Sequence, residues 1–261
     1  MAKLLVLLAL TVFAGRVFLS AADVQQTNSS APVLVELFTS EGCSSCPPAD
    51  QLLQQLDKSQ PVAGAQLIVL SEHVDYWNHI GWTDPYSSRF FTDRQSAYSE
   101  SFKLNTVYTP QMVVDGTTEF VGNDPTRATQ AIYQSLKQKK VPVRISGISL
   151  DGANILQAHV EAEGLPDSSR AGKADVFLVV ALNHVESKVL RGENGGRRLT
   201  HVAVVTSLAK VGSVEIGKNF AKDVQLKLDT KTDPNNLRLI AFVQQPNQHQ
   251  VLGAALQRIE R

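Results

Sequence analysis

The chain has 261 residues, of which 43% are hydrophobic and 19% charged, so it can form one large domain or two ordinary ones around a buried core. Its 25 basic and 25 acidic residues give a formal net charge of zero, without a long run of either sign. Because nucleic-acid-binding proteins concentrate basic residues on one surface, this balance argues against a nucleic-acid partner.

Residues 1–22 have the layout of a secretory signal peptide. Lys3 precedes an apolar run over residues 4–15, and small residues follow at positions 20–22. A transmembrane helix needs about 20 apolar residues, so this run is too short and we expect no integral membrane domain. We therefore expect cleavage after Ala22 and a secreted or periplasmic mature protein.

The segment around this leader leaves one alternative open. Arg16 is unusual for a signal peptide, and an uncleaved N-terminal anchor is the other interpretation of the same residues. Residues 23–32 are polar and aperiodic, which predicts a disordered lead-in before the first domain.

The first predicted strand is followed closely by both cysteines of the chain. Residues 33–38 are apolar except for Glu36, which predicts a strand covered on both faces. Glu36 is either a carboxylate beneath the cysteines that exchanges protons, or a strand residue at a polar edge. Both cysteines of the chain, Cys43 and Cys46, then precede a predicted helix. A sulfur at a helix N-terminus is favoured as a thiolate by the free N–H groups and the helix dipole.

Three interpretations of this Cys-x-x-Cys pair compete. A redox pair is favoured by the position at the helix start. A closed zinc site would need two further ligands, because a second Cys-x-x-Cys does not occur in the sequence. An inert bridge between Cys43 and Cys46 would close a very short loop and so stabilise the fold little.

A second buried strand, residues 66–71, runs into a polar stretch over residues 72–77. If the strand continues, His73, Asp75 and Trp77 share one face, which could border the cysteines. Asp84-Pro85 then has the pattern of a helix start and predicts helical segments over about residues 85–103. These segments either pack on the sheet or cover the cysteine site as a lid.

The next elements form a hairpin and a helix. Thr109-Pro110 opens a predicted strand over residues 111–114 that ends at an Asp-Gly turn, and a second strand over residues 118–121 completes the hairpin. A cis bond before Pro110 is compatible with this pattern. Asp124-Pro125 repeats the helix-start pattern.

The order strand, Cys-x-x-Cys, helix, strand, helical insertion, Thr-Pro strand, hairpin strand and helix is thioredoxin-like. More closely, residues 35–50, 73–77 and 108–114 resemble a family of secreted thioredoxin-like proteins catalogued as a domain of unknown function. The resemblance implies an α/β thioredoxin-like domain over residues 33–140 and export, but no established substrate. It also implies that Thr109-Pro110 is the loop that lies against the Cys-x-x-Cys turn.

After residues 140–142 the pattern becomes all strand, which predicts an all-β sandwich-like domain over residues 141–261 following the α/β thioredoxin-like domain. The predicted strands are residues 143–150, 155–161, 174–189, 199–208, 224–228, 237–244 and 251–259.

Several polar residues in this half are given no catalytic role. The glycines in residues 192–196 fit a long hairpin loop, in which Arg197 and Arg198 are solvated rather than bound to an anionic partner. Four histidines lack metal-ligand spacing and are interpreted as ordinary strand or loop residues, namely His159, His184, His201 and His249.

The favoured function is thiol-disulfide exchange with a thiol- or disulfide-containing protein, without a cofactor. Cys43 would attack and Cys46 would resolve the mixed disulfide. Glu36 would assist proton transfer. The substrate would lie along Thr109-Pro110 and contact Tyr108 and Trp77.

Two other functions remain open. Copper binding or delivery would use Cys43, Cys46 and His73, since thiolates and imidazole suit copper(I), with Asp75 and His79 as weaker third ligands. A non-catalytic interaction protein would dock a partner through its second domain.

Overall fold

The computed structural model describes residues 30–151, 154–169, 171–229 and 232–259, and the predicted signal peptide and most of the lead-in lie outside them. The elements in chain order are β1 (Ala31–Thr39), α1 (Pro47–Ser59), β2 (Ala65–His73), η1 (Asn78–Ile80), α2 (Arg89–Phe102), β3 (Gln111–Val114), β4 (Thr118–Val121), α3 (Pro125–Ser135), β5 (Val143–Leu150), β6 (Ile155–Ala162), β7 (Lys173–Lys188), β8 (Arg198–Glu215), β9 (Phe220–Lys227), η2 (Pro234–Asn236), β10 (Leu237–Gln244) and β11 (Val251–Arg258). None of the helices described is both long enough and apolar enough to cross a membrane.

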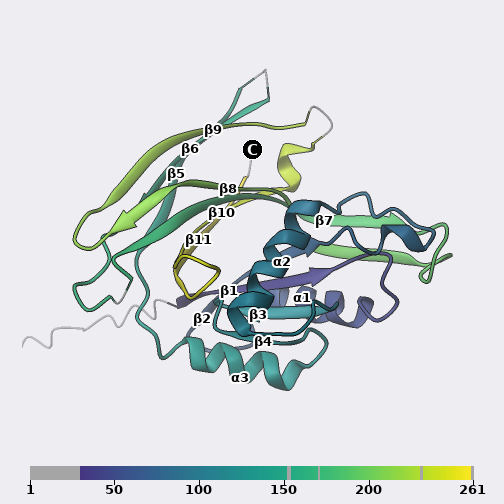
Figure 1. Cartoon of the computed structure of the whole chain (residues 1–261). Helices are drawn as coiled ribbons and strands as arrows, with labels where there is room; N and C mark the ends of the chain where they lie inside the picture. Colours follow the sequence, from purple (N-terminus) through teal and green to yellow (C-terminus); the bar gives the residue numbers. More distant parts are fainter. Residues whose placement is uncertain (1–29, 152–153, 170, 230–231, 260–261) are drawn as a thin grey trace, which may run out of the picture.

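One mixed sheet of eight strands forms the centre of the molecule, in the order β11-β10-β7-β8-β2-β1-β3-β4 (Figure 1). β1 and β2 are parallel, while β3 runs antiparallel to β1. The long strand β8 joins the other side of β2 in parallel, where Ser71 pairs with Val204. Strands from both halves of the chain therefore share one hydrogen-bonded sheet.

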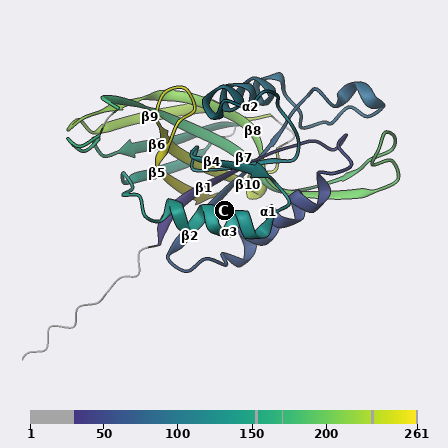
Figure 2. The ribbon, with the colours of Figure 1, turned by 60° about the horizontal axis from the view of Figure 1, so that its bottom comes forward.

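The two faces of β1 and β2 are covered by different helices, because successive strand residues point to opposite faces. Val33, Val35 and Leu37 pack with the apolar sides of α1 and α3. Leu34 and Phe38 pack with α2 residues on the other face. Figure 2 shows the same division, with α1 and α3 on one side of the sheet and α2 on the other.

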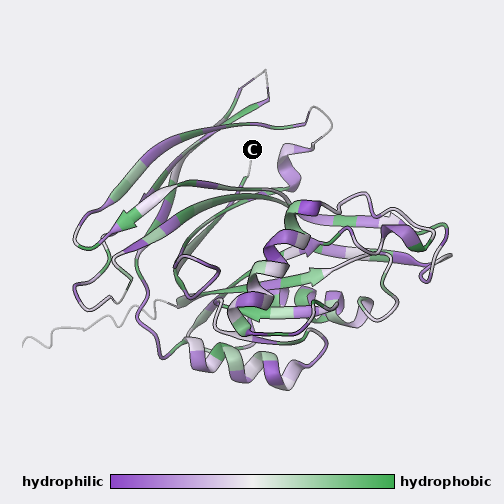
Figure 3. Ribbon diagram, viewed as in Figure 1, coloured by the Kyte–Doolittle hydropathy of each residue, from purple (hydrophilic) through white to green (hydrophobic). Residues whose placement is uncertain are grey.

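α1 and α3 are amphipathic, and the apolar side of each helix packs against the sheet. In α1, Leu52, Leu53 and Leu56 recur at helical spacing and are buried, while Gln51 and Gln55 are exposed. In α3 the buried residues are small or aliphatic, including Ala128 and Ile132, and Figure 3 shows hydrophobic and hydrophilic bands along this helix.

A second sheet, β5-β6-β9, is antiparallel and lies over the β7, β10 and β11 part of the large sheet (Figure 1). Their shared core includes Val160 of β6, Val176 of β7 and Leu239 of β10. Along β6, buried and less buried residues alternate, as expected of a strand with one core-facing side.

The prediction of an α/β thioredoxin-like domain followed by an all-β sandwich-like domain is wrong. The chain is mostly strand, and its largest sheet is a single mixed sheet that continues from β2 into β8. α1 of the first half is also tied to β10 of the second by two hydrogen bonds from Arg238 to Asp57, of 2.8 and 3.0 Å. The sequence pattern predicts where the strands lie. It does not specify that the open edge of β2 pairs with the distant strand β8.

Candidate disulfide site

Cys43 and Cys46 form a disulfide at the start of α1, with their Cα atoms 5.4 Å apart. The turn before the helix is held by local backbone bonds, from Cys43 N–H to Ser40 O and from Cys46 N–H to Cys43 O. Cys46 is the N-cap residue, and prolines occupy the first helical turn, where the missing N–H costs no hydrogen bond. The sequence therefore places the sulfurs at a helix N-terminus, as the spacing predicts.

Both cysteines are fully buried, although Ser44 and Ser45 between them are exposed. Residues 189–197, which connect β7 to β8, cover the turn. The side-chain amide of Asn194 donates to the carbonyl oxygens of Glu41 and Cys43, at 2.9 Å each. Glu193 accepts a hydrogen bond from Ser44 N–H at 3.1 Å. A loop from the second half of the chain thus closes over the disulfide.

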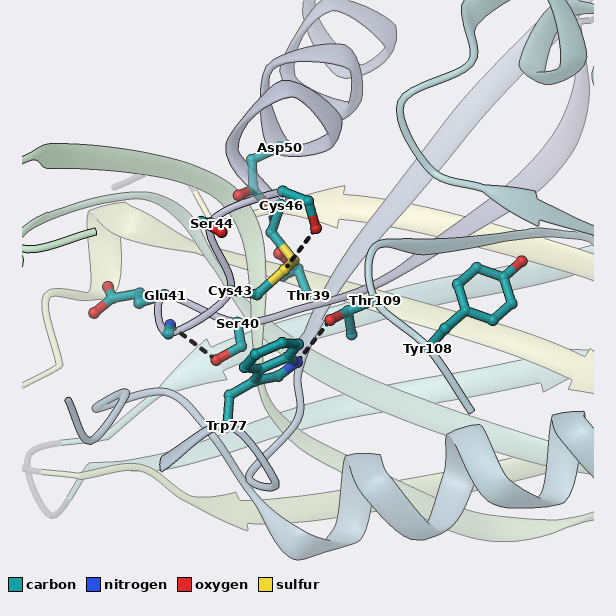
Figure 4. The surroundings of a disulfide bond; sticks show 12 residues. Thr39, Ser40, Glu41, Cys43, Ser44, Cys46, Asp50, Trp77, Tyr108 and Thr109 are labelled. Atoms are coloured by element: carbon teal, nitrogen blue, oxygen red, sulfur yellow. Dashed lines mark hydrogen bonds between the residues drawn. A yellow bond between two sulfur atoms is a disulfide. The ribbon is translucent and has the colours of Figure 1, made fainter. Parts of the chain in front are cut away.

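The predicted substrate-contacting residues lie in different environments. Trp77 is half-buried beside the disulfide, and its indole N–H donates to Thr109 Oγ1 at 2.7 Å (Figure 4). The Tyr108 ring points away from the sulfurs, and its hydroxyl donates to Glu119 at 2.5 Å. Burial first, and then Glu119, raises the pKa of Tyr108. Pro110 is buried, and the bond before it is cis.

Glu36 lies on the α2 face of β1. Its carboxylate accepts hydrogen bonds from Arg94 at 2.8 and 2.5 Å and from the Tyr98 hydroxyl at 2.5 Å. The Glu36 carboxylate is therefore paired with Arg94 of α2, and the structure does not bring it together with the cysteines.

His73 ends β2 on the α1 face and is fully buried. Its Nδ1 lies 2.7 Å from Asp84 Oδ2, and the same carboxylate accepts the N–H groups of Glu41 and Tyr86. Burial raises the pKa of Asp84, but His73 and these N–H groups outweigh it, so the net shift is downward. An ionised Asp84 accepts, so His73 carries its proton on Nδ1.

The prediction that a helix begins at Asp84-Pro85 is wrong, because the Asp84 carboxylate is hydrogen-bonded to His73 and is not the N-cap of α2. α2 begins at Arg89, and the Ser88 hydroxyl caps it by accepting the N–H of Phe90. The dipeptide has the right local pattern, but a buried histidine offers the carboxylate a stronger partner than a helix end.

The copper ligand set Cys43, Cys46 and His73 is not assembled in this form. The sulfurs are bonded to each other, and His73 Nδ1 faces Asp84. Among the residues described, no group of three His, Cys, Asp or Glu side chains is arranged to hold a metal ion.

Two residues beside the disulfide were given no functional role from the sequence. His201 of β8 is buried, with Nδ1 3.5 Å from Asp50 Oδ1 and Nε2 3.7 Å from Glu41 Oε1. Asp50 lies in the first turn of α1, where its negative charge suits the helix dipole. The pairing of β8 with β2 brings His201 here, and a single sequence carries no signal for that pairing.

Comparison with known proteins gives a family without an assigned activity. The family model described as "Protein of unknown function (DUF1223)" matches residues 34–244, and no curated protein matches the chain. Protein AGR_C_4864 from Agrobacterium tumefaciens has a similar structure, with 25% identity and a TM-score of 0.66 over 88% of this chain and 95% of that chain. HBP35 of Porphyromonas gingivalis has a similar fold, with 17% identity and a TM-score of 0.64 over 88% of this chain and 76% of that chain. Since the family match spans most of the sequence, the chain belongs to the family described as "Protein of unknown function (DUF1223)".

Proposed function

We propose that this protein is a thiol-disulfide oxidoreductase whose redox pair is Cys43 and Cys46. The observation that carries the proposal is their disulfide at the first turn of α1, where helix N–H groups stabilise a thiolate. Export, predicted from residues 1–22, is part of the proposal, since oxidising compartments let disulfides persist.

The exchange begins with a substrate thiolate that attacks Sγ of Cys43. A bond forms between the two sulfurs, the Cys43–Cys46 bond breaks, and its electron pair stays on Sγ of Cys46. Cys46 suits the leaving position, because it is the N-cap residue of α1. Attack of the Cys46 thiolate on the mixed disulfide reverses the step.

Access to the sulfurs requires movement of what covers them. Trp77 is held by its bond to Thr109, and Asn194 is held by two carbonyl oxygens of the turn. We propose that a substrate chain displaces Trp77 and lies along Thr109, beside the exposed Ser44 and Ser45.

The test is equilibration of the native protein in glutathione buffers of varied redox ratio, followed by alkylation and mass measurement of free thiols. We expect Cys43 and Cys46 to become reducible together and reversibly without unfolding. Cys46→Ser should accumulate a mixed disulfide with glutathione on Cys43, whereas Cys43→Ser should accumulate much less because Cys46, the N-cap residue of α1, is the leaving group of the exchange. Reduction only in denaturant would sink the proposal.

A second candidate is a non-catalytic protein with a structural disulfide, and the full burial of both sulfurs favours it. In that case the glutathione experiment gives reduction only on unfolding, and replacement of both cysteines by serine leaves function intact.

A further inference from the structure

Five buried titratable residues converge behind the disulfide from five separate segments, and we call them the His201 cluster. Its members are Glu41 of the turn, Asp50 of α1, His73 of β2, Asp84 of the loop before α2 and His201 of β8. Each is at most 5% exposed. Five titratable side chains buried together are unusual, because charged groups are rarely buried unless an oppositely charged group pairs with them.

His201 is the centre of this cluster. The rings of His73 and His201 meet edge to face, with centroids 4.7 Å apart. Asp50 and Glu41 flank the two nitrogens of His201, at 3.5 and 3.7 Å. Asp84 completes the arrangement on the far side of His73, and Tyr86 contacts the His73 ring.

Several polar atoms in the cluster face one another without forming hydrogen bonds. Within the described part of the chain, His201 Nδ1 and Nε2, His73 Nε2 and Glu41 Oε1 have no hydrogen-bond partner. A site that exchanges protons needs free positions on nitrogen and oxygen, and these atoms provide them.

The charges of the cluster depend on protonation. Its three carboxylates form ion pairs only with His73 and His201 among the described residues, so all the positive charge comes from imidazole. Burial lowers the pKa of His201, but Asp50, Glu41 and Asp84 outweigh it and shift that pKa upward. The surrounding carboxylates therefore favour the protonated form of His201.

Asp50 contacts His201 through its side chain and Cys46 through its backbone. Its backbone N–H donates to Cys46 O at 3.1 Å, and its Oδ1, which faces His201, also accepts the Thr39 hydroxyl at 3.0 Å. Figure 4 shows Asp50 and Thr39 next to the disulfide.

We propose that the His201 cluster is the proton-exchange site of the Cys43–Cys46 pair, in which Asp50 carries the proton between His201 and Cys46. This inference rests on the proposed oxidoreductase function. When a substrate thiolate bonds to Cys43 and the electron pair of the broken bond moves to Cys46, one proton passes from protonated His201 through the Asp50 carboxylate to Sγ of Cys46. The products are the mixed disulfide, the Cys46 thiol and neutral His201.

The direct test is an NMR titration of the histidine rings in the full chain, oxidised and then reduced with excess dithiothreitol. Wherever the Cys46 thiol of the reduced protein is ionised, its negative charge beside the cluster favours protonated His201, so the titration of His201 should extend to higher pH in the reduced protein than in the oxidised protein. The exposed His184 should titrate identically in both states. Identical titration of His201 in both states would overturn the proposal.

The second test measures how the equilibrium with glutathione depends on pH. By reciprocity, His201→Gln and Asp50→Asn should keep a reversible couple but change its pH profile by about tenfold in the equilibrium constant across the range in which His201 titrates. His184→Gln should leave the profile unchanged. An unchanged profile in His201→Gln rejects the proton site alone, while an irreducible wild-type disulfide rejects the proposed function and the proton site together. If the variants do not fold, the wild-type NMR titration decides.

Discussion

Two buried charged clusters lie on opposite faces of β1 and β2 and differ in where their positive charge comes from. On the α2 face, Arg94 is paired with Glu36 and bonded to Tyr98 and Gln244, and we call this set, with Glu72, the Arg94 cluster. On the α1 face, the His201 cluster has only imidazoles for its carboxylates.

The difference separates a fixed charge from a switchable one. Burial lowers the pKa of Arg94, but Glu36 and the neighbouring acids outweigh it, so this guanidinium stays charged at every accessible pH. The imidazoles of the His201 cluster carry a positive charge only when they are protonated. The sheet therefore keeps its permanent ion pair away from the disulfide and its proton-exchanging groups beside it, and each of the following experiments tests that division.

The largest effect is expected for Arg94→Met. Removal of the guanidinium leaves the buried Glu36 carboxylate without its partner, which costs about 3–5 kcal/mol in the free energy of unfolding. Urea unfolding of the oxidised protein measures it. The matched control is Arg89→Met in the same helix, because Arg89 is exposed and its pair with Asp93 is solvated. Equal losses in both variants would contradict a structural role for the Arg94 cluster.

The next largest effect is expected for a change in residues 189–197, the loop that covers the disulfide. Asn194→Ala removes the two hydrogen bonds that the Asn194 amide donates to the carbonyl oxygens of Glu41 and Cys43, at a cost of about 1–3 kcal/mol. The rate of disulfide reduction by dithiothreitol should rise as well. Asn123→Ala, at an exposed position, is the control. A lower stability without faster reduction would mean that this loop does not control access.

Glu72→Gln tests the pH response of the Arg94 cluster. Burial raises the pKa of Glu72 well above its ordinary value, and Glu36 adds to this, while Arg94 opposes it. The folded state thus binds more protons than the unfolded state. This contribution is complete below the ordinary Glu pKa and is lost as pH rises through the raised folded pKa, with a slope of at most about 1.4 kcal/mol per pH unit.

The glutamine variant should lose that slope and become more stable relative to wild type as pH rises. Urea unfolding at a series of pH values measures the slope, and Glu100→Gln, exposed on α2, is the control. A wild-type slope that survives in Glu72→Gln would assign it to other groups.

The smallest effect is expected for Glu193→Gln. Glu193 is exposed, and its hydrogen bond from Ser44 lowers its own pKa. Its negative charge near the start of α1 opposes a Cys43 thiolate, so the variant should increase the acid dissociation constant of that thiol by about two- to fivefold. The pH dependence of alkylation of the reduced protein measures this, and Glu186→Gln, whose partner is Arg198, is the control. An unchanged or weaker acidity would show that Glu193 does not act on the sulfur.

The sequence by itself determined most local elements. Strands expected at residues 143–150 and 237–244 coincide with β5 and β10, and Asp124-Pro125 does start a helix. The position of both cysteines before α1 was also readable. These features depend on hydrogen bonds and side-chain periodicity within a few residues, which the sequence states directly.

Only the tertiary structure decided which strands pair and what each strand face meets. β8 joins β2, so His201 lies against His73 and the two expected domains share one sheet. The Glu36 carboxylate pairs with Arg94 and does not lie with the cysteines, because α2 covers the face of β1 on which Glu36 lies. Strand partners are chosen by long-range edge pairing and burial, and the period of a strand specifies two faces but not their neighbours.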